Sequence, residues 1–214
     1  MLTRALFTAI VLLVALGAMR DWAISKNNTY RLLDLGAGVF GNSHTRLYLV
    51  LVWVWSVGGI LEVLFLGRAF SLLFFAIGAV LALCGQILRR AARNALGQRW
   101  TCDIVSLPGN PLVTGQIYDR MRHPEYAGTF LLFIGVPMLH GAWITFFFSL
   151  AAGVMLIITR VRLEEAVLGE DARYQSAMGD RPRFLPRRIP VSDREPSRPT
   201  RFRPRSRRGD LPGV

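Results

Sequence analysis

The chain has 214 residues, of which 52% are hydrophobic and 19% are charged, and its formal net charge is +12. Its mean hydropathy of +0.35 exceeds that of ordinary soluble domains, which excludes a typical soluble enzyme and indicates an integral membrane protein. Two cysteines are too few for a disulfide framework, and the Cys and His spacings match no metal site. We therefore expect Cys84 and Cys102 to be free thiols and no metal to be bound.

Five apolar runs follow one another along the chain and predict an all-α, polytopic membrane helix bundle with about five transmembrane helices. A helix needs roughly 17 to 25 residues to span the hydrocarbon core, a length that the second, third and fifth runs reach. The first and fourth runs are short, and we expect the fourth to pair with the fifth as a helical hairpin around Gly141. The runs are Ala5–Met19, Leu47–Leu66, Phe70–Leu88, Tyr126–Gly141 and Ala142–Thr159.

Basic residues divide unequally between the two sides that five spans would define. The connecting segments Arg20–Arg46 and Arg89–Arg122 hold 10 Lys/Arg on one side, whereas the other side holds 2, Arg4 and Arg68. The positive-inside rule then predicts an N-terminus outside and a C-terminus in the cytoplasm, in a cell inner membrane. The first run also resembles a cleaved signal peptide, but cleavage would leave the first basic segment in the wrong compartment. In the second span, Glu62 is expected to pair with Arg68 or to reach the lipid headgroups.

The segment before the fourth run is longer than a simple connector and ends in the sequence Arg122-His123-Pro124, which we call the His-Pro step. Pro124 favours an extended conformation of His123 and suits the first turn of a helix. A helix that begins there directs free N–H groups and a partial positive charge toward His123, and Arg120 and Arg122 add full charges. This pattern predicts a site for an anionic group, although a capped helix start with an interfacial Tyr126 is an alternative interpretation.

Two acidic residues, Glu164 and Glu165, follow the fifth run, with Arg160 four residues before the first and Arg162 three before the second. Surface ion pairs, each worth about 0.3 to 0.5 kcal/mol, are the ordinary interpretation. Two acids late in a helix are unfavourable for its dipole unless a cation compensates them, and a ligand could supply that cation. We therefore predict that a charged small molecule lies between this cluster and the start of the fourth span.

These charged clusters belong to a series of motifs in a fixed order. The series is Leu96-Gly97-x-x-Trp100, Leu112-Val113-Thr114-Gly115-x-x-Tyr118, Arg122-His123-Pro124-x-Tyr126-x-Gly128, Arg160-x-x-x-Glu164-Glu165-x-x-Leu168, Tyr174 and Pro186. It resembles the isoprenylcysteine carboxyl methyltransferase family, which is related to phospholipid methyltransferases. The resemblance implies N-terminal transmembrane helices at 1–90 and a methyltransferase cofactor-binding region with two transmembrane helices at 91–186.

The resemblance also implies the chemistry of the site. It implies an integral membrane methyltransferase that uses S-adenosyl-L-methionine, bound in a pocket facing the cytoplasm, to methylate a lipophilic or thiol small-molecule acceptor. Arg160 falls on the position that binds the substrate, and Arg160 and Glu164 are the implied catalytic residues. The implied cofactor-binding residues are Leu112, Val113, Tyr118, His123, Pro124, Tyr126 and Glu164.

The acceptor remains open at this stage. A protein isoprenylcysteine carboxylate, a small thiol and a phospholipid amine are candidates, and an amine would need a proton acceptor, for which Glu165 is the nearest residue. An excess of arginine, 25 Arg against one Lys, is typical of GC-rich genomes and makes a bacterial source plausible. An NADPH-dependent sterol-type reductase is a second enzyme class, and a lipid-tethered adaptor that acts through its basic tail is a non-enzymatic alternative.

Residues 187–214 form that tail, in which Arg and Pro alternate with Ser, Asp and Gly without an apolar period. We expect it to be disordered. Its 9 arginines could bind anionic lipid headgroups at about 1 kcal/mol per charge. Nucleic-acid binding is less favoured, because Phe202 is the only aromatic residue there.

Overall fold

The computed structural model describes residues 1–107, 109 and 112–186, apart from the side chains of residues 42 and 43. The expectation of a disordered, lipid-binding tail at 187–214 lies outside these residues. The described part contains the helices α1 (Leu2–Asp34), α2 (Asn42–Phe65), α3 (Leu72–Leu96), α4 (Pro124–Met138), α5 (Trp143–Leu168) and α6 (Ala172–Met178). It also contains the strands β1 (Gly38–Phe40) and β2 (Ile104–Ser106) and the short 3-10 helices η1 (Gly97–Arg99) and η2 (Gln116–Asp119).

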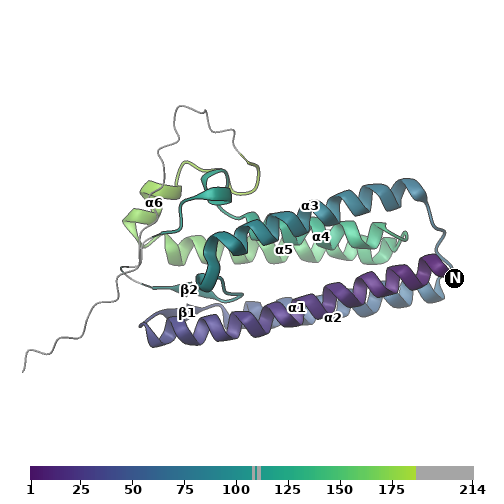
Figure 1. Ribbon diagram of the computed structural model, residues 1–214, viewed down its shortest axis with the longest axis horizontal. Coiled ribbons are helices and arrows are strands. Elements are labelled where there is room, and N and C mark those ends of the chain that lie inside the picture. The colour runs from purple at the N-terminus through teal and green to yellow at the C-terminus, as the bar shows by residue number, and fades with distance from the viewer. Residues whose placement is uncertain (108, 110–111, 187–214) are drawn as a thin grey trace, which may run out of the picture.

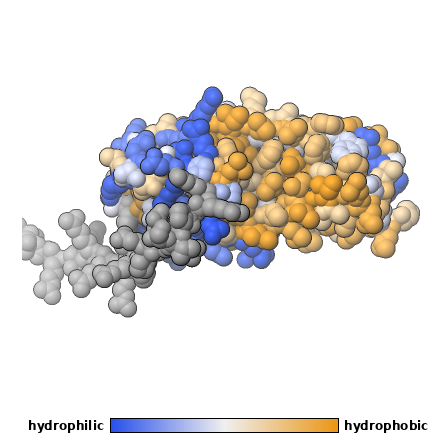
Figure 2. All heavy atoms as spheres, turned by 90° about the horizontal axis from the view of Figure 1, so that it is seen from above, coloured by the Kyte–Doolittle hydropathy of each residue, from blue (hydrophilic) through white to orange (hydrophobic). Residues whose placement is uncertain are grey.

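Four helices of the described chain, α1, α2, α3 and α5, are long and apolar enough to cross a membrane. The predicted all-α membrane bundle is therefore confirmed, and the protein is an integral membrane protein. α4 differs from the five-span expectation, because its 15 residues rise only about 22 Å against a hydrocarbon core of roughly 30 Å. Figure 2 shows hydrophobic residues along most of the bundle and hydrophilic residues gathered mainly at one end.

α1 is longer than its apolar run predicts. It has 33 residues, because much of the segment Arg20–Arg46, expected as a connection, continues the helix without Pro and without Gly before Gly36. This extension buries Ser25 and Asn28 rather than leaving them in water. The first helix therefore reaches well beyond its apolar run and contributes polar side chains to the interior.

The helices form two groups that lie along one another (Figure 1). α1 and α2 are side by side, α3 and α4 form the most extensive helix pair, and α5 contacts both α2 and α4. β1 and β2, which the sequence did not predict, pair antiparallel with Val39 opposite Val105. They lie with α6 at the end of the molecule away from the N-terminus (Figure 1), which we call the polar end.

α4 begins at the predicted His-Pro step but ends at Met138, before the predicted limit of its apolar run at Gly141. His123 is the residue before its first turn and Pro124 is its first residue, as the His-Pro step predicts. At the other end, residues 139–142 connect α4 to α5, and Gly141 takes a φ of 66°, which favours glycine. The predicted helical hairpin around Gly141 is confirmed.

α3 and α4 approach each other through glycines spaced seven residues apart on each helix. A Cβ atom at Gly78 would lie 2.5 Å from the carbonyl oxygen of Gly135, and one at Gly85 would lie 2.5 Å from that of Gly128. The two pairs run antiparallel, and the nearest atom to a Cβ at each of the four glycines is a backbone atom of the other helix. Small residues allow such close approach of membrane helices, and the seam fixes α4 against α3 just below the His-Pro step.

Glu62 is buried near the end opposite the polar end, where it caps α5. Its carboxylate accepts the backbone N–H groups of Ile144 at 2.9 Å and Thr145 at 2.8 Å, and the Thr145 hydroxyl at 2.9 Å. Arg68 lies 2.7 Å from the same carboxylate, so the predicted pair is confirmed. No side chain of α5 itself caps its first turn, and the buried charge of Glu62 stabilises those N–H groups instead.

We expect Glu62→Gln to lower the free energy of unfolding by about 1 to 3 kcal/mol, because an amide cannot accept all four of these bonds and does not compensate Arg68. Thermal unfolding in one detergent or nanodisc preparation measures the loss. Glu170→Gln, an exposed residue beyond α5, is the control and should be neutral. Equal unfolding temperatures for the two variants would contradict the capping role.

Candidate functional site

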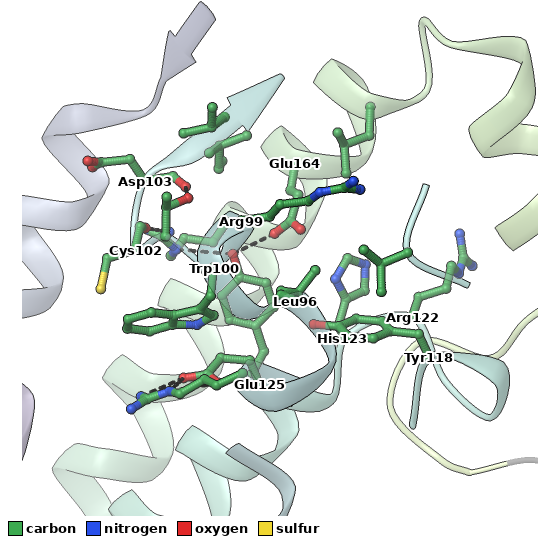
Figure 3. Close-up of a pocket in the computed structure, with 18 of the residues that line it drawn as sticks. Leu96, Arg99, Trp100, Cys102, Asp103, Tyr118, Arg122, His123, Glu125 and Glu164 are labelled. Carbon is green, nitrogen blue, oxygen red and sulfur yellow. Dashed lines mark hydrogen bonds and ion pairs between the residues drawn. The ribbon is translucent and has the colours of Figure 1, made fainter. Parts of the chain in front are cut away.

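A cavity of about 300 Å³ lies at the polar end, lined by the helices and by the segment that connects α3 to α4 through β2 and η2. It gathers seven of the eight residues that the sequence predicted for the site: Leu112, Val113, Tyr118, His123, Tyr126, Arg160 and Glu164. The eighth, Pro124, is fully buried as the first residue of α4 and does not line the cavity. Figure 3 shows Glu164, His123 and Tyr118 turned toward one space, with Trp100 on its other side.

Tyr126 connects the two predicted catalytic residues. Its hydroxyl donates to Glu164 Oε2 at 2.6 Å and lies 3.4 Å from Arg160 Nε, which donates to it. Arg160 is buried, and its remaining bonds go to the Thr45 hydroxyl and the Cys102 carbonyl, which are neutral acceptors. Arg160 and Glu164 take part in none of the ion pairs of the described residues. Arg160 and Glu164 therefore place a positive and a negative charge at the cavity, linked to each other through the Tyr126 hydroxyl.

The two arginines expected beside the His-Pro step behave differently. Arg122 lines the cavity and forms an ion pair with Glu165 at 3.1 Å, while its Nε is buried without a hydrogen-bond partner among the described residues. Arg120, by contrast, is exposed and does not line the cavity, so its expected contribution to the site is wrong. It lies directly after η2, where its side chain turns to the solvent.

An apolar wall faces these charges. Leu112, Val113 and Tyr118 pack with Tyr174 of α6 and with Leu168 at the end of α5. Burial raises the pKa of the Tyr118 phenol and raises that of Tyr174 to about 12, so both rings are neutral at physiological pH. Neutral aromatic and aliphatic side chains of this kind suit a flat, uncharged ring system.

A four-residue charge network closes the side of the cavity next to α1. Arg93 contacts Asp21 at 2.5 Å and Glu125 at 2.9 Å, and Arg89 contacts the same two carboxylates at 3.2 and 3.4 Å. The Arg93 guanidinium also lies 4.3 Å from the centre of the Trp100 ring. Glu125 therefore balances these arginines as well as lying in the first turn of α4, and the network as a whole is neutral.

The segment after η1 is held by the first two helices. Asn28 of α1 donates to the Trp100 carbonyl at 2.8 Å, and Ser25 accepts the Cys102 N–H at 2.7 Å. Thr45 of α2 donates to the Cys102 carbonyl at 3.1 Å, the oxygen that Arg160 also contacts. The backbone of Cys102, rather than its thiol, therefore positions Arg160.

Burial raises the pKa of the Cys102 thiol to about 11, so the group is protonated at pH 8 and its reactivity increases only as the pH approaches that value. In a Cys84→Ser background, we expect alkylation by iodoacetamide at pH 8 to be at least about tenfold slower than that of a free thiol with a pKa of about 8.5. The pH profile of the rate measures this. A rate that levels off below pH 9 would contradict the burial.

No group of three or more His, Cys, Asp or Glu residues that could hold a metal ion occurs in residues 1–107, 109 and 112–186. Both cysteines are free in the structure, with Cys84 exposed on α3.

A comparison with known proteins shows which family the site region matches. Residues 76–170 match the family described as "Isoprenylcysteine carboxyl methyltransferase (ICMT) family". The chain carries an ICMT-family domain. A relative from Bacillus subtilis (strain 168), named "Uncharacterized protein YpbQ", is 28% identical over 165 residues, which cover 77% of this chain and 98% of the relative. The ICMT domain runs from early α3 through α5 and contains every site residue that the sequence predicted.

Several residues that shape the cavity lie outside the ICMT domain; sequence reasoning missed Asp21 and Tyr48, whereas Tyr174 belongs to the motif series but had no predicted role. Asp21 of α1 and Tyr48 of α2 line the cavity, as does Tyr174 of α6. Within the domain, the pair Arg89 and Arg93 was also missed, although two arginines one turn apart at the end of an apolar helix are a usable signal. Asp21 gave no comparable signal, because its role depends on α1 lying against α3.

Proposed function

We propose that the protein is an S-adenosyl-L-methionine-dependent methyltransferase of the membrane, most like protein-S-isoprenylcysteine O-methyltransferases, acting on the carboxylate of a lipophilic acceptor. The ICMT domain supports a methyltransferase in general terms. The observation that carries the finer proposal is the pair of opposite charges, Arg160 and Glu164, which face one cavity and join no ion pair in the part of the chain that the structure describes.

The residues present fit S-adenosylmethionine, which carries a carboxylate and two cationic groups and, when bound, supplies an electrophilic methyl group. Glu164 would hold a cationic part, since the Tyr126 hydroxyl is its one hydrogen-bond donor among the described side chains. Arg122, whose Nε is buried and unpartnered among the described residues, would hold a carboxylate beside the start of α4. The apolar wall around Leu112 and Tyr118 would take the uncharged ring.

Arg160 would act on the acceptor. Its guanidinium is held by the Cys102 carbonyl, by Thr45 and by Tyr126, so its orientation is fixed before a ligand arrives. A fixed positive charge in a cavity sheltered from water stabilises an anionic acceptor and aligns it for attack. A carboxylate or a thiolate needs only this alignment and partial desolvation, because neither has a proton to lose.

The lipophilic character of the acceptor follows from the deep side of the cavity. There the lining residues belong to membrane-spanning helices and include Ala18, Tyr48, Leu156 and Ile157. Glu165, the proton acceptor expected for an amine acceptor, does not line the cavity and is surrounded by Arg122, His123 and Arg183. These contacts favour a carboxylate or a small thiol over a phospholipid amine.

A sterol-type reductase that uses NADPH is less well supported. The phosphates of that cofactor require several positive charges that acids do not already compensate. Arg89 and Arg93, which line the cavity, are each already paired with Asp21 and Glu125.

We also propose that the polar end faces the cytoplasm, with the N-terminus outside. The polar end contains the connecting segments with the excess of arginine, whereas Arg4 and Arg68 belong to the opposite end. The cofactor would then enter from the compartment in which it is made, and a greasy acceptor would arrive from the bilayer.

Methyl transfer from labelled S-adenosylmethionine in nanodiscs tests the function. Three acceptors are compared: a prenylated cysteine with a free carboxylate, a small alkyl thiol, and phosphatidylethanolamine in the nanodisc. We expect the label on the prenylated cysteine as a base-labile methyl ester. Label on the amine alone would overturn the acceptor proposal, and no transfer to any of the three would overturn the proposed reaction.

A further inference from the structure

Glu165 follows Glu164 in the sequence, but its side chain does not line the cavity and contacts a different set of residues. Its carboxylate accepts from Arg183 Nη2 at 2.7 Å, from His123 Nε2 at 3.0 Å and from Arg122 Nη1 at 3.1 Å. The ion pair considered with Arg162 does not occur among the described residues, where Arg162 is exposed. Glu165 thus joins the His-Pro step to a segment that follows α6.

We call that segment, residues 181–184, the strap. Its backbone runs beside the His-Pro step, where the Arg122 N–H donates to the Pro182 carbonyl at 2.9 Å and the His123 N–H donates to the Arg183 carbonyl at 3.0 Å. At one end of the strap, Arg181 donates to the Tyr118 carbonyl at 2.5 Å.

The far end of the strap meets the imidazole directly. The Phe184 ring lies 6.2 Å from the His123 ring, centre to centre. The strap does not line the cavity, yet it contacts Tyr118, Arg122 and His123, which do. It also lies beyond residue 170, where the family match ends.

We propose that Glu165 is a positioning residue, which latches the strap through Arg183 and thereby holds His123 and Arg122 in the conformation that binds the cofactor. This inference rests on the proposed function. A carboxylate only accepts hydrogen bonds, so Nε2 of His123 must carry the proton, and in the neutral ring Nδ1 is then an acceptor. Glu165 therefore fixes the ring orientation and which nitrogen carries the proton, as well as the backbone behind it.

The test uses two variants with matched controls. Glu165→Gln keeps the shape of the side chain but removes the charge that three partners share, and Arg183→Ala removes the latch alone. Arg173→Ala is the control for the second variant, because the Arg173 side chain is 54% exposed and ion-paired, against 55% for Arg183. Glu170→Gln is the control for the first.

We expect labelled S-adenosylmethionine to dissociate about tenfold faster from Glu165→Gln and about threefold faster from Arg183→Ala, with both controls unchanged. The KM for the cofactor should rise in the same order while kcat stays within about twofold. A lower kcat at constant KM would overturn the positioning role, because it would place Glu165 in the reaction itself.

Hydrogen exchange provides a readout that needs no ligand. The backbone amides of Arg122 and His123 should exchange faster in both variants than in their controls, because the strap carbonyls protect them. Unchanged exchange would overturn the latch even if the protein bound no cofactor. Failure of the wild-type protein to bind S-adenosylmethionine, with faster exchange in the variants, would instead contradict the proposed function.

Discussion

Replacing Glu164 with Gln should weaken S-adenosylmethionine binding by about 10- to 100-fold. Gln can still accept the Tyr126 hydroxyl, so the substitution removes the charge and keeps the local hydrogen bond. A charge-assisted hydrogen bond contributes about 1.5 to 3 kcal/mol, and 1.4 kcal/mol corresponds to a tenfold change in affinity. Because none of the ion pairs of the described residues includes Glu164, the lost energy is that of the ligand contact.

Isothermal titration of purified protein in nanodiscs measures this loss. Glu170→Gln, at an exposed position near the same helix end, removes the same charge and should bind as the wild type does. Thermal unfolding of each variant shows whether the fold is intact. Equal affinities for Glu164→Gln and its control would exclude Glu164 from the cofactor site.

Substituting Leu for Gly85 should prevent the bundle from assembling. Even a Cβ atom there would lie 2.5 Å from the Gly128 carbonyl and 2.8 Å from the Leu132 nitrogen, and backbone atoms cannot move aside as a side chain can. Overpacking of a tight interface costs about 1 to 3 kcal/mol and more where backbones collide, so we expect a loss of at least about 3 kcal/mol. α4 would move away from α3, and the His-Pro step would move with it.

Yield of folded, monodisperse protein and its unfolding temperature report this effect. Gly17→Leu is the matched control, because Gly17 is also in a membrane helix but a Cβ atom there meets nothing within 4 Å. The control should be nearly neutral. Similar yields and unfolding temperatures for the two variants would contradict the backbone seam between α3 and α4.

Local sequence patterns predicted much of the fold. Apolar runs predicted the bundle, and Pro124 and Gly141 correctly predicted where α4 starts and how it turns into α5. Two features of the fold were not predicted from the sequence. α1 continues far past its apolar run because polar residues such as Asn28 are buried against another segment, which hydropathy along one helix does not reveal. The brief pairing of β1 with β2 is likewise a contact between distant segments.

The candidate site likewise contains residues that could be predicted from the sequence and residues that could not. Residues within the ordered motifs, such as Tyr126, Arg160 and Glu164, could be grouped from the sequence, and the structure brings them to one cavity. The residues that contact them could not be grouped with them from the sequence. Asp21 and the strap act through contacts between helices or segments far apart in the chain, and no spacing rule links them to the His-Pro step. Roles for the site residues in binding and catalysis stay predictions until a ligand is tested.

A structure of the protein with S-adenosylhomocysteine, determined by cryo-electron microscopy in nanodiscs, tests the central claim most directly. We predict density for the ligand inside the cavity, between Glu164 and His123, with its ring against Leu112 and Tyr118. Density at any other place, or an empty cavity at a ligand concentration that saturates binding, would contradict the account.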